Sequence, residues 1–225
     1  MKRKFLAAIM VFISLVLIGC GHDHSSAPPP PPNIITQIFS DSVIDGDILV
    51  PFGTPVANGT VTNLTPTIQS VFAGIDSSTG NEYRAFLDFP LGGQNGVPLN
   101  ASIVSATLDI VIDSVSVSPG AAIPIRVDLV SFPPPLIVTD FDRNSLTPLA
   151  SVIGPLITSA DVNNHVFIDV TPLMVEAQNQ AVPNFQIRIL EDFGPPVPLP
   201  GFIEIDDSTG ANRTALAPLL QVEYF

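Results

Sequence analysis

The chain has 225 residues, with 24 prolines, no tryptophan, and a formal net charge of −13 at neutral pH. A surface this acidic repels phosphate backbones, so nucleic acid is excluded as an expected partner. The sequence has a single cysteine, which excludes an intramolecular disulfide, so the fold must be held by its core alone.

Residues 1–19 have the parts of a secretory signal peptide. A positive start at residues 2–4 precedes an apolar run over residues 5–18, broken only by Ser14. This run is shorter than the roughly 20 apolar residues of a membrane-spanning helix. It ends in Leu17-Ile18-Gly19-Cys20, which resembles the lipobox of bacterial lipoproteins. The resemblance implies that Cys20 is lipidated and becomes the new N-terminus; the alternatives are an uncleaved anchor and an ordinary secretory signal.

Residues 20–33 are predicted to be a tether between the lipidated Cys20 and the folded domain. The proline run Pro28–Pro32 favours an extended polyproline II stalk. His22-Asp23-His24 is a pattern that binds transition metals, but no third strong ligand is nearby, and a simple spacer is the alternative. Gram-negative lipoproteins retained in the inner membrane commonly carry aspartate directly after the cysteine. Gly21 stands there, so the resemblance implies a lipid-anchored envelope protein, in the outer membrane if the host is Gram-negative.

Beyond the tether, residues 34–225 are predicted to form one all-β domain. Short runs of alternating apolar and polar residues are separated by Pro, Gly, Asn and Asp, which is typical of antiparallel strands with one solvated face. The expected strands are residues 71–75, 83–89, 104–112, 123–129, 166–170, 185–190, 202–205 and 219–225, with weaker signals at 37–43 and 136–141. This number and spacing of strands indicate a sandwich of two antiparallel sheets.

One short helix is expected to begin at Thr171. Thr171 is suited to cap a helix, Pro172 suits the first helical position, and residues 173–180 allow two turns. A helix of this kind commonly closes one end of a sandwich.

Four segments resemble the DNRLRE-type domains, surface β-sandwich modules akin to carbohydrate-binding jelly rolls. They are Glu-Tyr-Arg-Ala-Phe-Leu-Asp-Phe at 82–89, Ala-Ser-Ile-Val-Ser-Ala-Thr-Leu at 101–108, Val-Phe-Ile-Asp-Val-Thr-Pro-Leu at 166–173 and Ala-Pro-Leu-Leu-Gln-Val-Glu-Tyr at 217–224. The signature that names the family is missing, and Ala217 replaces its usual basic residue. The resemblance implies a jelly-roll-like sandwich and suggests carbohydrate binding, although sandwiches host many roles.

Catalytic motifs are scarce. His165 is the one histidine beyond the tether, no Gly-x-Ser-x-Gly elbow occurs, and no glycine-rich loop joins a strand to a helix. Carboxylate pairs are plentiful, and whether two of them form a glycosidase site depends on three-dimensional geometry. We predict that the protein is not an enzyme.

Calcium is the cofactor that the acidic residues suggest. Asp140, Asp142 and Asn144 present oxygen-bearing side chains at alternate positions, although Ser145 and Ser151 stand where an EF-hand loop needs glycine and glutamate. Asp45 with Asp47, and the pair Asp206-Asp207, are further candidates for a structural calcium site near strand ends. The alternative is that these side chains bond to the backbone of their own turns.

Arginines and tyrosines are the remaining candidates for ligand contacts. Arg84, Arg126 and Arg188 either recognise a ligand carboxylate or each pair with an aspartate of a neighbouring strand on the solvated face; we predict the second. Tyr83 and Tyr224 are expected in the core, which leaves no evident flat ring for a sugar.

The sequence therefore predicts a non-catalytic, lipid-anchored envelope protein that displays one β-sandwich in a structural or adhesive role. Its expected partners are the membrane, through the anchor, and an extracellular polysaccharide or an envelope protein. The alternatives are a carbohydrate-binding module for an extracellular polysaccharide and an enzyme that acts on such a polymer.

Overall fold

The structure is a computed structural model that describes residues 32–93, 95–192 and 200–225. Residues Asn33–Phe225 group into one unit by their contacts. Cys20 and the tether residues 21–31 lie outside the described residues. Within the described part, no helix is long and apolar enough to cross a membrane.

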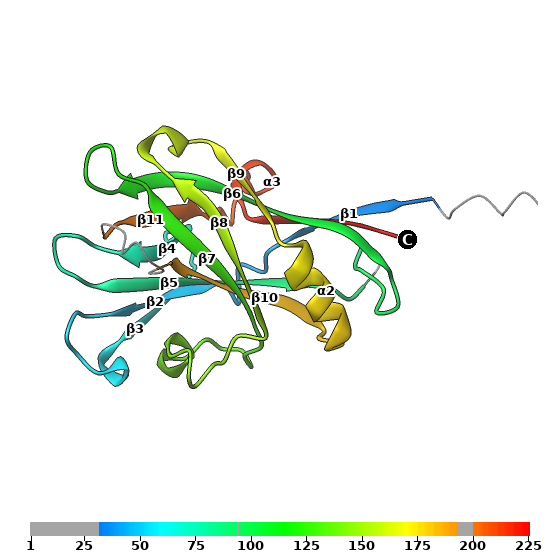
Figure 1. Ribbon diagram of the computed structural model, residues 1–225, viewed down its shortest axis with the longest axis horizontal. Helices are drawn as coiled ribbons and strands as arrows, with labels where there is room; N and C mark the ends of the chain where they lie inside the picture. The colour runs from blue at the N-terminus through cyan, green and yellow to red at the C-terminus, as the bar shows by residue number, and fades with distance from the viewer. Residues whose placement is uncertain (1–31, 94, 193–199) are drawn as a thin grey trace, which may run out of the picture. The chain divides into compact units, whose positions relative to one another are not determined.

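The domain is all-β and antiparallel, as expected (Figure 1). Its described strands are β1 (Ile34–Phe39), β2 (Gly46–Val50), β3 (Thr60–Asn63), β4 (Ser70–Ile75), β5 (Glu82–Pro90), β6 (Ile103–Ser116), β7 (Ile123–Val130), β8 (Ala150–Ile157), β9 (His165–Asp169), β10 (Asn184–Glu191), β11 (Phe202–Asp206) and β12 (Leu219–Tyr224). The neighbour order is β1-β12-β6-β11-β4-β5-β10-β7-β8, with β2 and β3 beside β5 and β9 beside β6.

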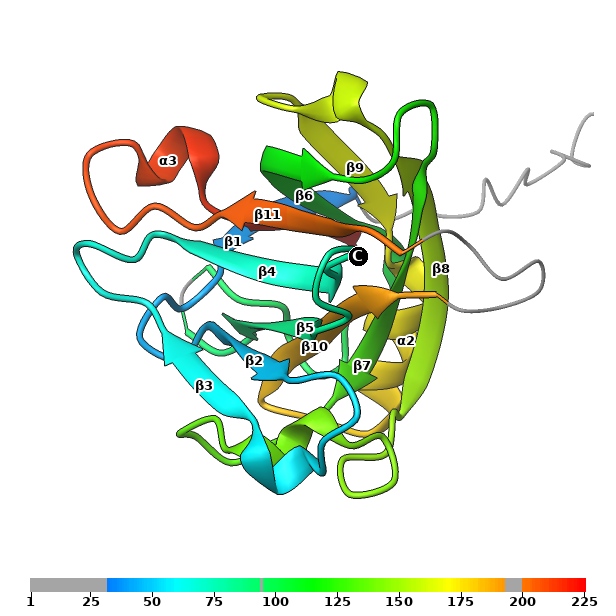
Figure 2. The ribbon, with the colours of Figure 1, turned by 90° about the vertical axis from the view of Figure 1, so that its left-hand side faces the viewer.

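The long strand β6 lets this sheet curl into a sandwich-like fold. The first half of β6 pairs with β12 and β9, and its last residues pair with β11. The same strand therefore belongs to both layers, and Figure 2 shows β11, β4, β5, β10, β7 and β8 continuing around the second layer.

The main core fills the space between the layers. The alternation predicted for residues 123–129 is confirmed, and that for residues 104–112 is confirmed from Ala106 onward, because the inward side chains of β6 and β7 are buried. Val104 is wrong as a core residue, since it is 41% exposed. The helix α2 (Thr171–Asn179) buries Leu173, Met174 and Ala177 against the same core. Its contacts with β6, β7 and β8 place it across one end of the layers, as expected (Figure 1).

A second, smaller apolar cluster lies on the outer face of the second layer. It consists of Ile48, Val50, Phe86, Val130, Phe132, Leu136 and Phe141. Residues 131–149 fold back over this face, so β5 and β10 are buried on both faces through most of their length. The expectation of one solvated face per strand is wrong for these two strands.

The structure also corrects several local predictions. Residues 136–141 are not a strand: Val138–Phe141 form a 3₁₀ turn, η2, because the Asp140 carboxylate accepts the backbone N–H of Ile137. The sequence analysis missed β2, β3 and β8. Thr171 does not cap α2 with its side chain, since its hydroxyl oxygen instead accepts the N–H of Ala106 in β6.

Gly74 lies where the backbone of β4 comes very close to the start of β11 and the residue before it. Its φ is +117°, and a Cβ there would lie 2.3 Å from the carbonyl oxygen of Gly201 and 2.7 Å from the Cα of Phe202. We expect Gly74→Ala to lower the free energy of unfolding by about 2–4 kcal/mol, measured by urea denaturation. Gly210→Ala meets no atom within 4 Å and is the matched control, with stability unchanged or slightly raised. Equal effects of the two substitutions would contradict this account of the β4–β11 contact.

Candidate functional site

A buried ion pair links two neighbouring strands on the outer face of the second layer. Arg188 of β10 lies opposite Asp128 of β7, and its Nη2 and Nε are 2.9 and 3.3 Å from Asp128 Oδ2. The predicted cross-strand pairing is confirmed, but the predicted solvated setting is wrong, because both side chains are fully buried. Burial lowers the pKa of the Arg188 guanidinium, and the hydrogen bonds to Asp128 oppose that shift.

Asp128 also fastens residues 131–149 to the sheet. The guanidinium of Arg143, from that segment, donates to both Asp128 oxygens at 3.0 and 3.2 Å. Ser151 of β8 donates to Asp128 at 2.6 Å, and Arg188 Nη1 donates to the backbone carbonyl of Asp140 at 3.0 Å. One carboxylate thus connects β7, β8, β10 and the covering segment.

The other two arginines of this face are held differently. Arg84 pairs with Glu82, two residues earlier on its own strand, at 2.6 Å, so the prediction of a neighbouring-strand aspartate is wrong for Arg84. The reason lies in the register, because the residue opposite Arg84 on β2 is Ile48. Arg84 also donates to the carbonyl of Phe141, and its guanidinium lies 3.9 Å above the ring of Phe141.

Arg126 of β7 pairs with Asp192, just beyond the end of β10, at 2.5 Å. The prediction of an aspartate on a neighbouring strand is therefore met only approximately for Arg126, because Asp192 lies one residue beyond β10. This pair is partly exposed, unlike Arg188 and Asp128.

These side chains border a cleft of about 360 Å³. It is lined by Glu82, Arg84, Arg126, Arg143, Leu190, Glu191 and Asp192. β5, β10 and β7 lie in succession there (Figure 2), so residues far apart in sequence meet on one surface. The cleft presents guanidinium donors next to carboxylate acceptors, and it holds three of the five arginines that follow residue 4.

Glu191 is the unusual group of the cleft. It is 2% exposed, and its Oε1 has no hydrogen-bond partner within the described residues. Its Oε2 accepts the N–H of Gly201 at 3.4 Å. Burial, with a smaller contribution from the charge of Glu82, raises the pKa of Glu191 to about 7. At neutral pH the carboxyl is therefore available both as a hydrogen-bond donor and as an acceptor.

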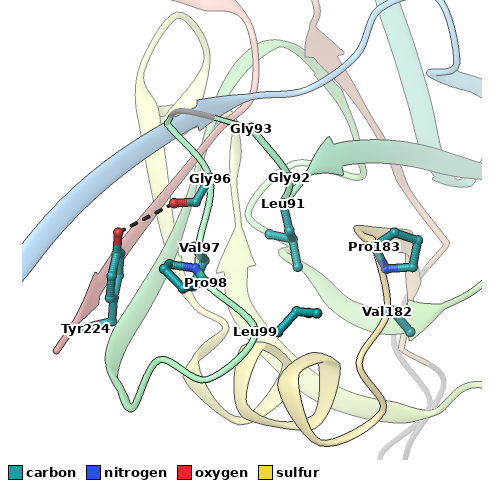
Figure 3. A pocket seen from close by; sticks show the side chains of 10 residues that line it. All are labelled: Leu91, Gly92, Gly93, Gly96, Val97, Pro98, Leu99, Val182, Pro183 and Tyr224. Atoms are coloured by element: carbon teal, nitrogen blue, oxygen red, sulfur yellow. Dashed lines mark hydrogen bonds between the residues drawn. The ribbon is translucent and has the colours of Figure 1, made fainter.

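A second hollow, of about 420 Å³, is apolar (Figure 3). Leu91, Leu99 and Pro183 surround it, and the Tyr224 hydroxyl donates to the Gly96 carbonyl at 3.5 Å on its rim. Among the residues that the structure describes, no charged side chain lines this hollow, so they offer little chemistry to orient a polar ligand.

The tyrosines lie in different settings. Tyr224 is 8% exposed, as expected for a core residue. Tyr83 is only half-buried, so the prediction of a core position is wrong for Tyr83. Its ring centroid lies 5.6 Å from those of Phe72 and Phe202, and the three rings form a partly exposed aromatic cluster.

The predicted calcium triplet lies in the turn around η2. Asp140 accepts the N–H of Ile137, and Asp142 Oδ1 accepts the backbone N–H and side-chain amide of Asn144. These bonds stabilise the turn itself, which is the alternative that the sequence allowed. Within the described ranges, no group of three or more His, Cys, Asp or Glu side chains is arranged to hold a metal ion.

Asp45 and Asp47 are both buried but do not share partners. Asp47 Oδ2 accepts the N–H of Phe72 at 3.4 Å, and burial raises the pKa of Asp47 to about 7. Asp45 accepts the N–H of Asp88 and contacts Asp207 instead. The structure therefore joins one residue from each of two candidate segments that the sequence analysis had treated separately.

His165 begins β9, one residue before the predicted start of this strand, and its Nδ1 lies 2.8 Å from Asp109. In the part of the chain that the structure describes, no serine hydroxyl bonds to its other ring nitrogen, so a Ser-His-Asp set is not assembled there. His22, Asp23 and His24 of the tether lie outside the described residues.

Sequence reasoning did not identify Glu82, Glu191, Asp192 or the role of Arg143. Arg143 lies between Asp142 and Asn144 of the predicted calcium triplet, and nothing in the local pattern shows that its loop folds over β7. One signal was present: a lysine-free domain with only five arginines places several of them in the middle of strands. Because these strands are neighbours in the folded sheet, their arginine side chains lie close together.

The fold and the cleft define an all-β, sandwich-like protein with a charged surface hollow. No protein-family model matches the chain, and no curated protein matches it closely enough to count as a relative.

The raised pKa of Glu191 is expected to make the free energy of unfolding depend on pH. Its pKa is raised from 4.5 in the unfolded chain to about 7 in the fold, so the folded state favours the protonated form. Its contribution to stability is therefore complete below about pH 4.5 and is lost as the pH rises through 7. We expect urea denaturation of Glu191→Gln to show a smaller loss of stability between pH 5 and 8 than the parent chain.

The remaining loss of stability between pH 5 and 8 is expected to come from other buried acids such as Asp47, whose pKa is also raised to about 7. Asp76→Asn is the control, because turn hydrogen bonds lower the pKa of Asp76 and place its titration below this window. An unchanged slope in Glu191→Gln would show that Glu191 is already ionised at pH 5.

Proposed function

We propose that the protein is a non-catalytic, lipid-anchored envelope protein whose β-sandwich binds a hydroxyl-rich polymer, an extracellular polysaccharide, through the arginine-lined cleft. One observation carries the proposal: the cleft places paired guanidinium and carboxylate groups side by side on one surface. A sugar hydroxyl both accepts and donates hydrogen bonds, so it can bridge such pairs. The role is adhesive, and it joins the structural or adhesive role expected from the sequence with the carbohydrate-binding role that was its alternative.

Charge favours a neutral polymer over an acidic one. Each of the five arginines within the described residues is ion-paired with a carboxylate. A ligand carboxylate would have to displace an internal partner, and it would approach a chain of net charge −13. A neutral hydroxyl group can join the existing pairs without separating them. This argument also supports the absence of nucleic acid among the partners.

Exposed aromatic side chains provide a second source of affinity for a sugar polymer. The cluster of Phe72, Tyr83 and Phe202 is partly exposed and offers apolar ring surface, which the faces of sugar rings favour. Glu82 of the cleft is the neighbour of Tyr83 in sequence. Since successive residues of a strand point to opposite faces, the cluster is not assigned to the cleft itself.

Binding is tested by retention of the full chain on immobilised neutral polysaccharides compared with polyuronates. We expect Arg126→Gln to weaken binding to the retained neutral polymer at least tenfold, because a charge-assisted hydrogen bond is lost. Tyr224→Phe is the matched control: it alters the apolar hollow of Figure 3 and is expected to leave binding unchanged. Affinity should also be independent of salt between 50 and 500 mM, since the ligand carries no charge.

Other outcomes of this experiment have defined meanings. A loss of binding in Tyr224→Phe but not in Arg126→Gln would move the site to the apolar hollow. Retention on polyuronates alone, weakened by salt, would replace the neutral polymer with an acidic one. Release of new reducing ends, abolished in Glu191→Gln, would indicate the enzyme alternative, which the raised pKa of Glu191 beside Glu82 keeps as the second candidate.

The anchor is tested separately, because Cys20 lies outside the described residues. We expect Cys20→Ser to release the protein from the membrane fraction into the soluble fraction of the producing bacterium, since the thiol that accepts the lipid is gone. Ser14→Ala, in the same signal segment, leaves the thiol in place and should keep the protein in the membrane fraction. Continued membrane attachment of Cys20→Ser would contradict lipidation at this position.

A further inference from the structure

Two buried aspartates, neither of which lines the arginine-lined cleft, contact each other. Asp45 precedes β2, and Asp207 follows β11. Neither side chain is exposed to solvent. Asp45 Oδ1 accepts the backbone N–H of Asp88 at 2.7 Å, and Asp207 Oδ1 lies 3.4 Å from the hydroxyl of Ser40.

The second oxygen of each carboxyl group has no hydrogen-bond donor within the described residues. These atoms are Asp45 Oδ2 and Asp207 Oδ2. Two adjacent carboxylates in the interior repel each other and have lost their hydration, which is costly unless a positive species lies between them. A shared proton or a metal cation meets that requirement.

Arg213, the first residue of α3 (Arg213–Leu216), does not fill this role. Its Nη1 is 3.4 Å from Asp207 Oδ1, while the same guanidinium donates to the carbonyl oxygens of Ser208 and Ser40. The arginine therefore approaches the oxygen of Asp207 that already has a partner. With both acids ionised, the three groups carry one net negative charge.

We propose that Asp45 and Asp207 bind a divalent cation, calcium, through their Oδ2 atoms, with Ser40 as a neighbouring oxygen donor. Carboxylate and hydroxyl oxygens are hard ligands, and calcium accepts irregular sets of them more readily than magnesium does. This site differs from the turn at Asp140, Asp142 and Asn144, where carboxylate oxygens are taken up by backbone and side-chain N–H groups.

The backbone around the site is already fixed by the fold. Ser40 N donates to the carbonyl of Pro218, Asp41 N donates to that of Asp88, and Asp207 N donates to that of Gln69. The two carboxyl groups thus meet without the cation. A bound ion would tie the β1–β2 connection to the loop between β11 and α3 (Figure 2).

A proton is the competitor of the cation. Burial and the charge of Asp207 both raise the pKa of Asp45, because this interior disfavours two unbalanced negative charges. A calcium ion would bind both groups as carboxylates, so any proton held between them would pass to solvent.

The test is calorimetric titration of the full chain, stripped with EGTA, with CaCl₂ at pH 7.5. We expect one calcium per chain and a dissociation constant on the order of 0.1–1 mM. Calcium at 100 times the dissociation constant should raise the melting temperature by roughly 5–10 °C.

Asp45→Asn is the decisive variant because its amide mimics the protonated acid. It keeps an acceptor for Asp88 N and a donor toward Asp207, so it should fold yet lose both the binding heat and the thermal shift. Asp47→Asn, two residues away and equally buried, and Asp142→Asn, in the η2 turn, should retain both signals. No calcium-dependent heat in the parent chain, or loss of the response in Asp142→Asn but not in Asp45→Asn, would overturn the proposal and leave a proton as the sole occupant.

Discussion

The buried pair Arg188–Asp128 is the interaction on which the outer face of this domain depends. A buried arginine is tolerable only where its charge and its N–H groups are matched, and here Asp128 and a backbone carbonyl match them. Such a pair contributes little net stability but imposes a strict geometry. Because Arg143 and the Asp140 carbonyl belong to the covering segment 131–149, the pair also determines where that segment lies. The second apolar cluster and one wall of the cleft follow from that position.

The arginines also offset part of the charge repulsion in this acidic, lysine-free domain. All five are used in ion pairs with carboxylates, and one of these pairs is fully buried. The remaining acids face solvent, share hydrogen bonds in turns, or are buried with raised pKa values, as Asp45, Asp47 and Glu191 are. Groups of the last kind cost stability near neutral pH, and two of them, Asp45 and Glu191, lie where ligands are proposed.

β6 and β7 were predictable from the sequence, because apolar residues alternate with more polar ones where one face of a strand packs on the core. β8 was missed because Gly154 and Pro155 interrupt its pattern, and β2 because Asp45-Gly46-Asp47 has the composition of a turn. Residues 136–141 were predicted as a strand because their apolar side chains signal burial, which a loop packed on a sheet also provides. The candidate site was less predictable, since Glu82, Arg126 and Arg143 meet only through the order of strands. The same limit applies to Asp45 and Asp207.

The central claim is that the Arg188–Asp128 pair holds residues 131–149 against the sheet and so shapes the cleft. Amide hydrogen exchange of Arg188→Met, compared with the parent chain under native conditions, tests this claim most directly. The account predicts at least tenfold faster exchange at the hydrogen-bonded amides of Phe132, Asp140 and Asp142, with protection in β6 and β12 retained. Unchanged exchange in residues 131–149, or an equal loss of protection throughout the domain, would contradict it.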